Sequence, residues 1–214
     1  MIARNVHKYI GAIAWISSVQ YFVVQIIVAN AWVDPFSVRK NPISDLGNTV
    51  CGEYSERYVC SPLHDLMNLS FVLLGFTMIV GSVFIARQFH IKHGISSGFS
   101  MLALAGFGTI LVGMYPENTI ANLHMLGASL PFLLGNIAMI ILADHLSLPK
   151  NLRIYTMTSG IVGLSALVLF LTGNYLSLGH GGMERLVAYP QTIWMIVFGV
   201  YQVRNAPKNN IYPR

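Results

Sequence analysis

Long uncharged stretches alternate with short charged segments along this chain of 214 residues. Six stretches lack Asp, Glu, Lys and Arg, and each has roughly the 18 or more residues that a helix needs to cross about 30 Å of hydrocarbon. Lipid-facing backbone must satisfy its own hydrogen bonds, so such runs predict helices rather than strands. The pattern predicts an all-α, polytopic integral membrane protein with a single transmembrane domain over residues 1–214. The expected spans are about 9–33, 63–86, 95–116, 122–143, 154–176 and 184–203, with an outer lid loop over 34–62.

Charged residues make up only 10% of the chain, against about 25% in an ordinary soluble domain. Six spans place both termini on one side, and the distribution of Lys and Arg indicates which side that is. Nine of these basic residues fall beside the termini or in the loops that share their side, whereas Arg39, Lys40, Arg57 and Arg185 fall on the other. The predicted topology is therefore N-in, C-in. The formal charge of +5 then describes an inner surface that meets anionic lipid, and no motif indicates nucleic-acid binding.

The only two cysteines, Cys51 and Cys60, both fall in the lid loop. The predicted topology places this loop outside, where disulfides form and persist. A bridge between the two would close a small loop and stabilise it by about 2–3 kcal/mol. The sequence therefore predicts a disulfide, with two free thiols or a two-cysteine metal site as the alternatives.

Short sequence segments repeat at an interval of sixty residues along the chain. Leu63-His64-Asp65-Leu66 recurs as Leu123-His124-Met125-Leu126, and Glu184 lies the same distance beyond His124. The spacing predicts a parallel internal repeat of helical hairpins, related by an axis along the membrane normal. Coincidence in a leucine-rich chain is the alternative. If the repeat is real, His64, His124 and Glu184 approach one level around a common axis at the outer ends of their helices.

Most of the acidic residues, and several histidines and asparagines, also fall on the predicted outer side. Ionisable groups at membrane spans usually face a bundle interior or a water-filled cavity, so this distribution predicts an outward-facing polar pocket. The candidate catalytic residues are His64, Asp65, His124 and Glu184. The candidate ligand-binding residues are Asn68, Glu117, Asn118, Arg185, Ser44 and Asp45.

Three chemistries fit such a pocket. His64, His124 and Glu184 offer ligands for a divalent metal such as zinc, although their spacing matches no local metal motif. Alternatively, a histidine acts as a general base oriented by Asp65 or Glu184, with Ser44 or Ser61 as available hydroxyls. In the third, Arg185 and the histidines bind a phosphate or carboxylate headgroup without chemistry. A purely structural interpretation pairs Arg185 with an acid and uses the histidines as helix caps.

The segment Asn41-Pro42-Ile43-Ser44-Asp45-Leu46-Gly47 resembles the loop signature of a prokaryotic membrane family of unknown activity, domain of unknown function 998. Matches continue in order through Asn68, Leu74-Gly75, Gly108 to Pro116, Leu123-His124, Gly127, Leu134-Gly135-Asn136, Gly182-Met183-Glu184-Arg185 and Tyr189-Pro190. The Ile43 to Gly47 loop is also similar to that of a broader Frag/DRAM/Sfk-like superfamily. That resemblance implies a six-span fold, a prokaryotic plasma-membrane location and a link to lipid remodelling.

The sequence thus predicts an integral membrane protein whose outer pocket binds, and in an enzymatic version modifies, a lipid headgroup or small polar molecule. Membrane lipids are the expected partners. A transporter or channel is one alternative, but the inner halves of the spans are nearly all apolar. A non-catalytic structural or interaction protein is the other. Substrate, metal and oligomeric state are left open by the sequence.

Overall fold

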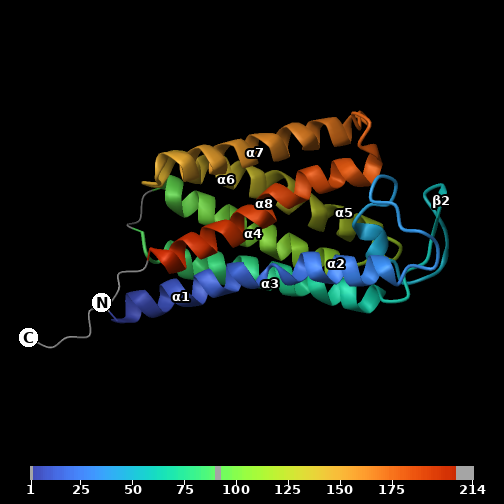
Figure 1. The fold of residues 1–214 in the computed structure, drawn as a ribbon, viewed down its shortest axis with the longest axis horizontal. Helices are drawn as coiled ribbons and strands as arrows, with labels where there is room; N and C mark the ends of the chain where they lie inside the picture. The colour runs from blue at the N-terminus through green and yellow to red at the C-terminus, as the bar shows by residue number, and fades with distance from the viewer. Residues whose placement is uncertain (1, 90–92, 206–214) are drawn as a thin grey trace, which may run out of the picture.

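Six helical spans form an elongated bundle in the computed structural model, which describes residues 2–89 and 93–205 (Figure 1). The predicted six-span, all-α fold is confirmed. The spans are α1 (Ile2–Ser17) with α2 (Gln20–Asn30), α3 (His64–Ala86), α4 (His93–Met114), α5 (Ala121–Leu130) continued by η2 (Pro131–Gly135) and α6 (Asn136–His145), α7 (Lys150–Leu171) and α8 (Gly179–Arg204).

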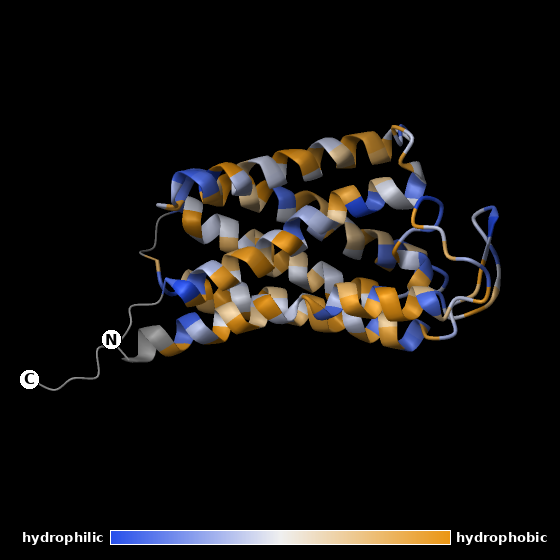
Figure 2. Cartoon of the chain, viewed as in Figure 1, coloured by the Kyte–Doolittle hydropathy of each residue, from blue (hydrophilic) through white to orange (hydrophobic). Residues whose placement is uncertain are grey.

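The spans form a closed ring in chain order. Each packs against the next, and α1 packs against both α3 and α8, so the first span closes the ring. Lys8 Nζ donates to the Asn205 carbonyl at 3.1 Å, which brings the start of α1 and the end of α8 to the same end of the bundle. Figure 2 shows hydrophobic residues along the length of the helices and hydrophilic ones gathered towards the two ends. The membrane orientation and the internal repeat stay predictions.

The first span is not one uninterrupted helix. At Ser18 and Val19 the amides bond to carbonyls three residues back, Ser18 N to Trp15 O at 3.2 Å and Val19 N to Ile16 O at 3.1 Å. Hydroxyl side chains that bond inside a membrane helix often bend it. The Ser18 hydroxyl lies 2.9 Å from that of Thr77 on α3, so the break also joins two spans.

The fourth span contains a wide, π-helical turn over Pro131–Gly135. Proline has no amide hydrogen to continue the helix ladder, and π turns inside α-helices occur frequently at functional sites. The Asn136 side-chain amide donates to the Phe132 carbonyl at 2.8 Å and to the Val187 carbonyl on α8 at 3.2 Å. The turn is thereby tied to α8.

An aromatic cluster fills the half of the bundle near the termini. The buried indoles of Trp15 and Trp194 lie with ring centroids 5.3 Å apart, and Phe99 and Phe198 pack against Trp15. The Trp194 indole N–H donates to the Thr156 hydroxyl at 2.8 Å. This half of the interior is consequently closed by side chains.

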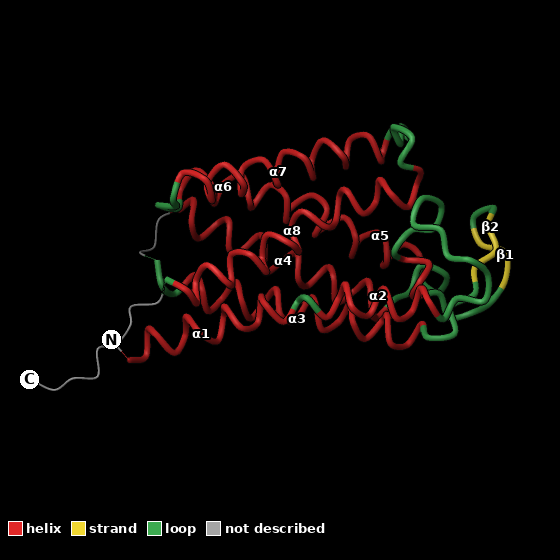
Figure 3. The backbone as a smooth tube through the Cα atoms, in the orientation of Figure 1, coloured by secondary structure: helices red, strands yellow, loops and turns green. Residues whose placement is uncertain are grey.

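The lid loop (residues 34–62) covers the opposite end of the bundle and contains a short 3₁₀ helix, η1 (Ser44–Gly47), and a hairpin of β1 (Gly52–Tyr54) and β2 (Arg57–Val59) (Figure 3). The two central residues of the hairpin turn, Ser55 and Glu56, have φ of 45° and 64°. Positive φ at both positions suits the right-handed twist of a two-residue hairpin turn.

Candidate functional site

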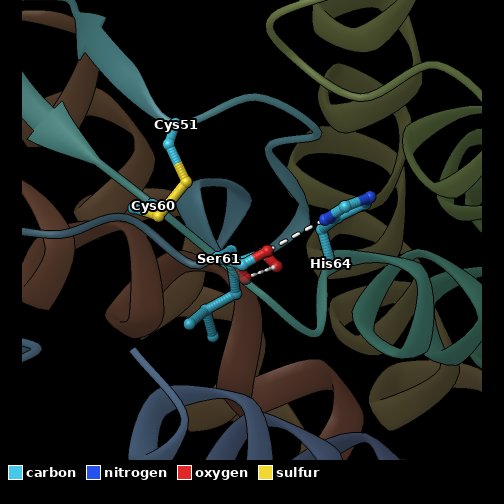
Figure 4. Close-up of a disulfide and its surroundings, with 5 residues drawn as sticks. Cys51, Cys60, Ser61 and His64 are labelled. Carbon is cyan, nitrogen blue, oxygen red and sulfur yellow. Dashed lines mark hydrogen bonds between the residues drawn. A yellow bond between two sulfur atoms is a disulfide. The ribbon is translucent and has the colours of Figure 1, made fainter. Parts of the chain in front are cut away.

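The Cys51–Cys60 disulfide predicted from the sequence is present at the base of the hairpin (Figure 4). It links the two segments that join the hairpin to the rest of the lid loop. Directly after it, the Ser61 hydroxyl donates to the Leu46 carbonyl at 2.7 Å. The disulfide closes the base of the hairpin, and the Ser61 hydrogen bond connects that base to η1.

Three consecutive residues fix η1 against the bundle. Asp45 is fully buried and accepts hydrogen bonds from the Arg57 guanidinium, with Nε 2.8 Å from Oδ2, and from the Asn41 amide at 3.0 Å. Leu46 is fully buried in the core. The Gly47 carbonyl accepts a bond of 2.9 Å from the Asn68 amide on α3. The first residue of η1, Ser44, is held in place by these anchors.

The Ser44 side chain lies between a histidine and a carboxylate. Its Oγ is 3.0 Å from Nε2 of His124 on α5 and 3.4 Å from Oε1 of Glu184 on α8. The other carboxylate oxygen of Glu184 accepts the backbone N–H of Ile43. His124 and Glu184 are both buried, at 6% exposed. His124 and Glu184, two of the three residues spaced sixty positions apart, thus both contact Ser44 of the lid loop.

A backbone contact determines the tautomer of His124. Its Nδ1 lies 2.9 Å from the carbonyl oxygen of Tyr115. A carbonyl can only accept, so Nδ1 carries the proton and Nε2 of the neutral ring is an acceptor. Ser44 Oγ has one proton, with Nε2 at 3.0 Å and Glu184 Oε1 at 3.4 Å as its acceptors. Donation to the nearer Nε2 is the arrangement in which an imidazole can remove a hydroxyl proton.

A narrow cavity of about 50 Å³ begins beside this cluster. Ser44 and Glu184 lie at one end of its lining, and Met78, Gln191 and Thr192 lie further along their helices. The walls between them are mostly apolar and come from five spans and η2, including Phe71, Leu74, Val112, Ala128 and Phe132. The Ser44 hydroxyl therefore adjoins an apolar space inside the bundle.

A family model matches residues 15–201, and its description is a protein of unknown function, DUF998. The chain belongs to the DUF998 family. The resemblance to this family that begins with the Asn41 to Gly47 segment is thereby confirmed, whereas the broader superfamily stays a prediction. No curated protein and no solved structure matches the chain. The DUF998 match supports a membrane protein, and any activity has to be argued from the site itself.

The second ionic cluster in this DUF998 member joins the lid loop to the connection between α4 and α5. Arg57 lies between Asp45 and Glu117, with Nη2 3.8 Å from Oε1 of Glu117. Burial raises the pKa of Glu117 to about 9, and the hydrogen bond to Asp45 and the charge of Asp45 act in the same direction. One guanidinium thus faces two carboxyl groups, and Glu117 keeps its proton at neutral pH.

The remaining predicted ligand-binding residues hold the lid loop. Arg185 Nη1 donates to the carbonyls of Val38 at 3.1 Å, Asn41 at 2.8 Å and Gly181 at 2.8 Å. Asn118 accepts the Thr49 amide at 3.2 Å and donates to the Thr49 hydroxyl at 3.0 Å. In the described structure, these side chains are used to position the lid loop rather than to present charge to a headgroup.

His64 and Asp65 do not join the Ser44 cluster. The His64 Nδ1 donates to the Ser61 carbonyl at 2.9 Å (Figure 4), while its Nε2 is 3.4 Å from the exposed carboxylate of Asp65. Over residues 2–89 and 93–205, no three His, Cys, Asp or Glu side chains are grouped to hold a metal ion. The structure does not bring the predicted metal ligands His64, His124 and Glu184 together, because His64 bonds to the Ser61 carbonyl just before α3, whereas His124 and Glu184 meet at Ser44.

Sequence reasoning missed the partners that complete the site. The Tyr115 carbonyl and the Ile43 amide are backbone groups, so their residue types carry no signal of these roles. Gln191, by contrast, lies seven residues after Glu184 on the same helix face, so the sequence itself indicates that polar character continues from Glu184 into the span.

Proposed function

We propose that this membrane protein is a histidine-assisted acyl hydrolase or acyltransferase acting on membrane-borne esters, with Ser44 as nucleophile and His124 as general base. The observation that carries the proposal is the 3.0 Å contact between Ser44 Oγ and His124 Nε2, with His124 Nδ1 bonded to the Tyr115 carbonyl. A nucleophile bonded to a base, and a base oriented by a third group, are the signature of nucleophilic catalysis. Here the third group is a backbone carbonyl.

The chemistry needs only these groups and water. Ser44 Oγ attacks the ester carbonyl carbon while its proton moves to His124 Nε2. The tetrahedral adduct collapses, the bond to the leaving alcohol breaks, and His124 returns the proton to that alcohol. Water, or an alcohol acceptor in a transferase, then attacks the acyl-Ser44 carbonyl and gives its proton to His124. The second adduct collapses with cleavage of the bond to Ser44 Oγ, His124 returns the proton to Oγ, and the acyl product leaves.

Glu184 positions the nucleophile. Its carboxyl group accepts the Ile43 amide and contacts the Ser44 hydroxyl, so it holds the start of η1 beside His124.

The transporter alternative needs a polar path through the whole bundle. Beyond the cavity, the interior is occupied by the aromatic cluster around Trp15 and Trp194. These rings separate the cavity from the end that carries the termini. The proposal therefore favours a site entered from one end only.

An alkyl fluorophosphonate, which reacts covalently with activated serines, tests the proposal on purified protein in lipid. The wild type should be labelled at Ser44, Ser44→Ala should not be labelled, and His124→Gln should react about 100-fold more slowly. Ser129→Ala is the matched serine control, since this exposed α5 hydroxyl bonds only to the Leu126 carbonyl. His180→Gln is the histidine control, since His180 stacks on Phe170.

The melting temperature of each variant reports whether the fold is kept. Equal labelling of the wild type and Ser44→Ala would refute the nucleophile. Equal rates for the wild type and a folded His124→Gln would refute the base. An unlabelled wild-type protein would remove the proposed activity altogether.

A further inference from the structure

The cavity below Ser44 has the dimensions of one hydrocarbon chain. Its lining on α8 begins at Glu184 and ends with Gln191 and Thr192, and Gln191 lies about 10 Å along the helix from Glu184 at 1.5 Å per residue. The cavity volume of about 50 Å³ is the space that the centres of water molecules can occupy. Spread evenly over that length, and with the radius of a water molecule added, it corresponds to a bore with a radius of about 2.6 Å. Packed carbon atoms have a radius of about 2 Å, so one extended chain fits and two chains or a ring do not.

The polarity of the lining fits the same occupant. Phe71, Leu74, Val112 and Phe132 give an apolar wall, and Ser44 and Glu184 stand at one end. A hydrocarbon chain gains free energy from such a wall, whereas a charged or strongly polar group would be desolvated there without enough partners. An ester carbonyl at Ser44 would place its chain in this space.

The far end of the cavity is formed by the side chain of Gln191. Gln191 is buried, its amide nitrogen lies 4.0 Å from the Met78 sulfur, and its side chain lines the cavity. Behind it, Gly135 of η2 leaves no room for a methyl group, because an added Cβ would overlap the Gln191 amide. The glycine of the π turn therefore sets how far Gln191 extends into the cavity.

We infer that the substrate is an ester with a single, unbranched acyl chain of about eight carbons, and that Gly135 and Gln191 set this length. The estimate takes about 1.3 Å per carbon for an extended chain along the cavity. The inference rests on the proposed function for the position of the ester at Ser44. The chain binding itself requires no reaction.

The first experiment compares hydrolysis of p-nitrophenyl octanoate and butyrate. The wild type should prefer octanoate by kcat/KM. Gly135→Ala should push Gln191 into the cavity and lower the octanoate-to-butyrate ratio at least tenfold, whereas Gln191→Ala should move the preference towards decanoate. Gly182→Ala is the control: its added Cβ meets only Leu178 Cβ, at 3.2 Å, so the ratio should not change. An unchanged ratio in folded Gly135→Ala and Gln191→Ala would overturn the length assignment.

The second experiment separates this inference from the proposed activity. Ser44→Ala, which cannot form the acyl intermediate, is photolysed with an eight-carbon fatty acid that carries a terminal diazirine. Crosslinks should map to the peptides of Met78 and Gln191 and be lost in Gly135→Ala. If Ser44→Ala gives these crosslinks but the wild type has no esterase activity, the proposed activity is refuted and the chain site is kept. Butyrate turnover without octanoate preference or crosslinks would refute the chain site alone.

Discussion

The ion pair between Arg57 and Asp45 should determine whether the lid loop stays docked. Arg57→Met removes the guanidinium and keeps much of the side-chain length. Asp45 then stays fully buried with the Asn41 amide and the protonated Glu117 carboxyl as its remaining side-chain donors among the described residues. Removal of one partner of a buried ion pair leaves an uncompensated charge, so the docked state should be strongly destabilised.

The size of the effect follows from the burial of the two groups. Breaking a buried pair costs about 3–5 kcal/mol, and the Arg57 side chain is 21% exposed, which favours the lower end. A loss of about 3 kcal/mol corresponds to roughly a 100-fold increase in the population of the undocked lid. Asp45→Asn in the same chain removes the buried charge and should restore most of the loss, with a coupling of about 2 kcal/mol.

Hydrogen exchange of the η1 amides at one fixed pH measures lid opening directly, since these amides report local rather than global unfolding. The exchange should accelerate about 100-fold in Arg57→Met and return towards the wild-type rate in the double variant. Lys40→Met is the matched control, because Lys40 is an exposed cation of the same loop. Exchange of η1 in Arg57→Met within threefold of the wild type would refute the argument that this pair holds the lid.

Three further predictions concern protonation, packing and orientation. The pKa of Glu117 is raised from 4.5 to about 9, so the contribution of its protonated form to stability is complete below pH 4.5 and is lost as the pH rises towards 9. The melting temperature of Glu117→Gln should therefore depend less on pH over this range than that of the wild type. Equal pH dependence of the two proteins would contradict the assignment. Gly75→Ala should destabilise the bundle by about 1–3 kcal/mol, because its Cβ would overlap the Gly106 carbonyl, whereas Gly182→Ala should melt near the wild-type temperature. Single cysteines at Ser55 and Lys150, in a chain without the native pair, should label from opposite sides of intact cells; labelling of position 150 from outside would reverse the predicted topology.

The number of spans was readable in the sequence because lipid imposes a length and a polarity on every helix that crosses it. The disulfide was equally accessible, since the chain has only two cysteines and both fall in one loop. The proline at position 131 makes a disturbance of the fourth span predictable in principle, but the bonds of Asn136 to the Phe132 and Val187 carbonyls are visible only in the structure.

The site was only half predictable. His124, Glu184 and Ser44 stood among the expected residues, because polar groups at membrane spans are costly and therefore conspicuous. Their arrangement came from contacts between distant segments: a lid-loop serine reaches α5 and α8 across sequence separations of 80 and 140 residues. His64 has the same residue type and repeat position as His124, yet it bonds to a carbonyl of its own turn.

Hydropathy and residue type act locally, and they determined that this chain crosses a membrane six times and carries polar groups towards one end. The direction of a side chain depends on backbone groups and packed neighbours that are far away in sequence. Only the tertiary structure could therefore decide that Arg57 and Arg185 hold the lid loop, that the Tyr115 carbonyl sets the tautomer of His124, and that a glycine packs behind Gln191, which lines the cavity.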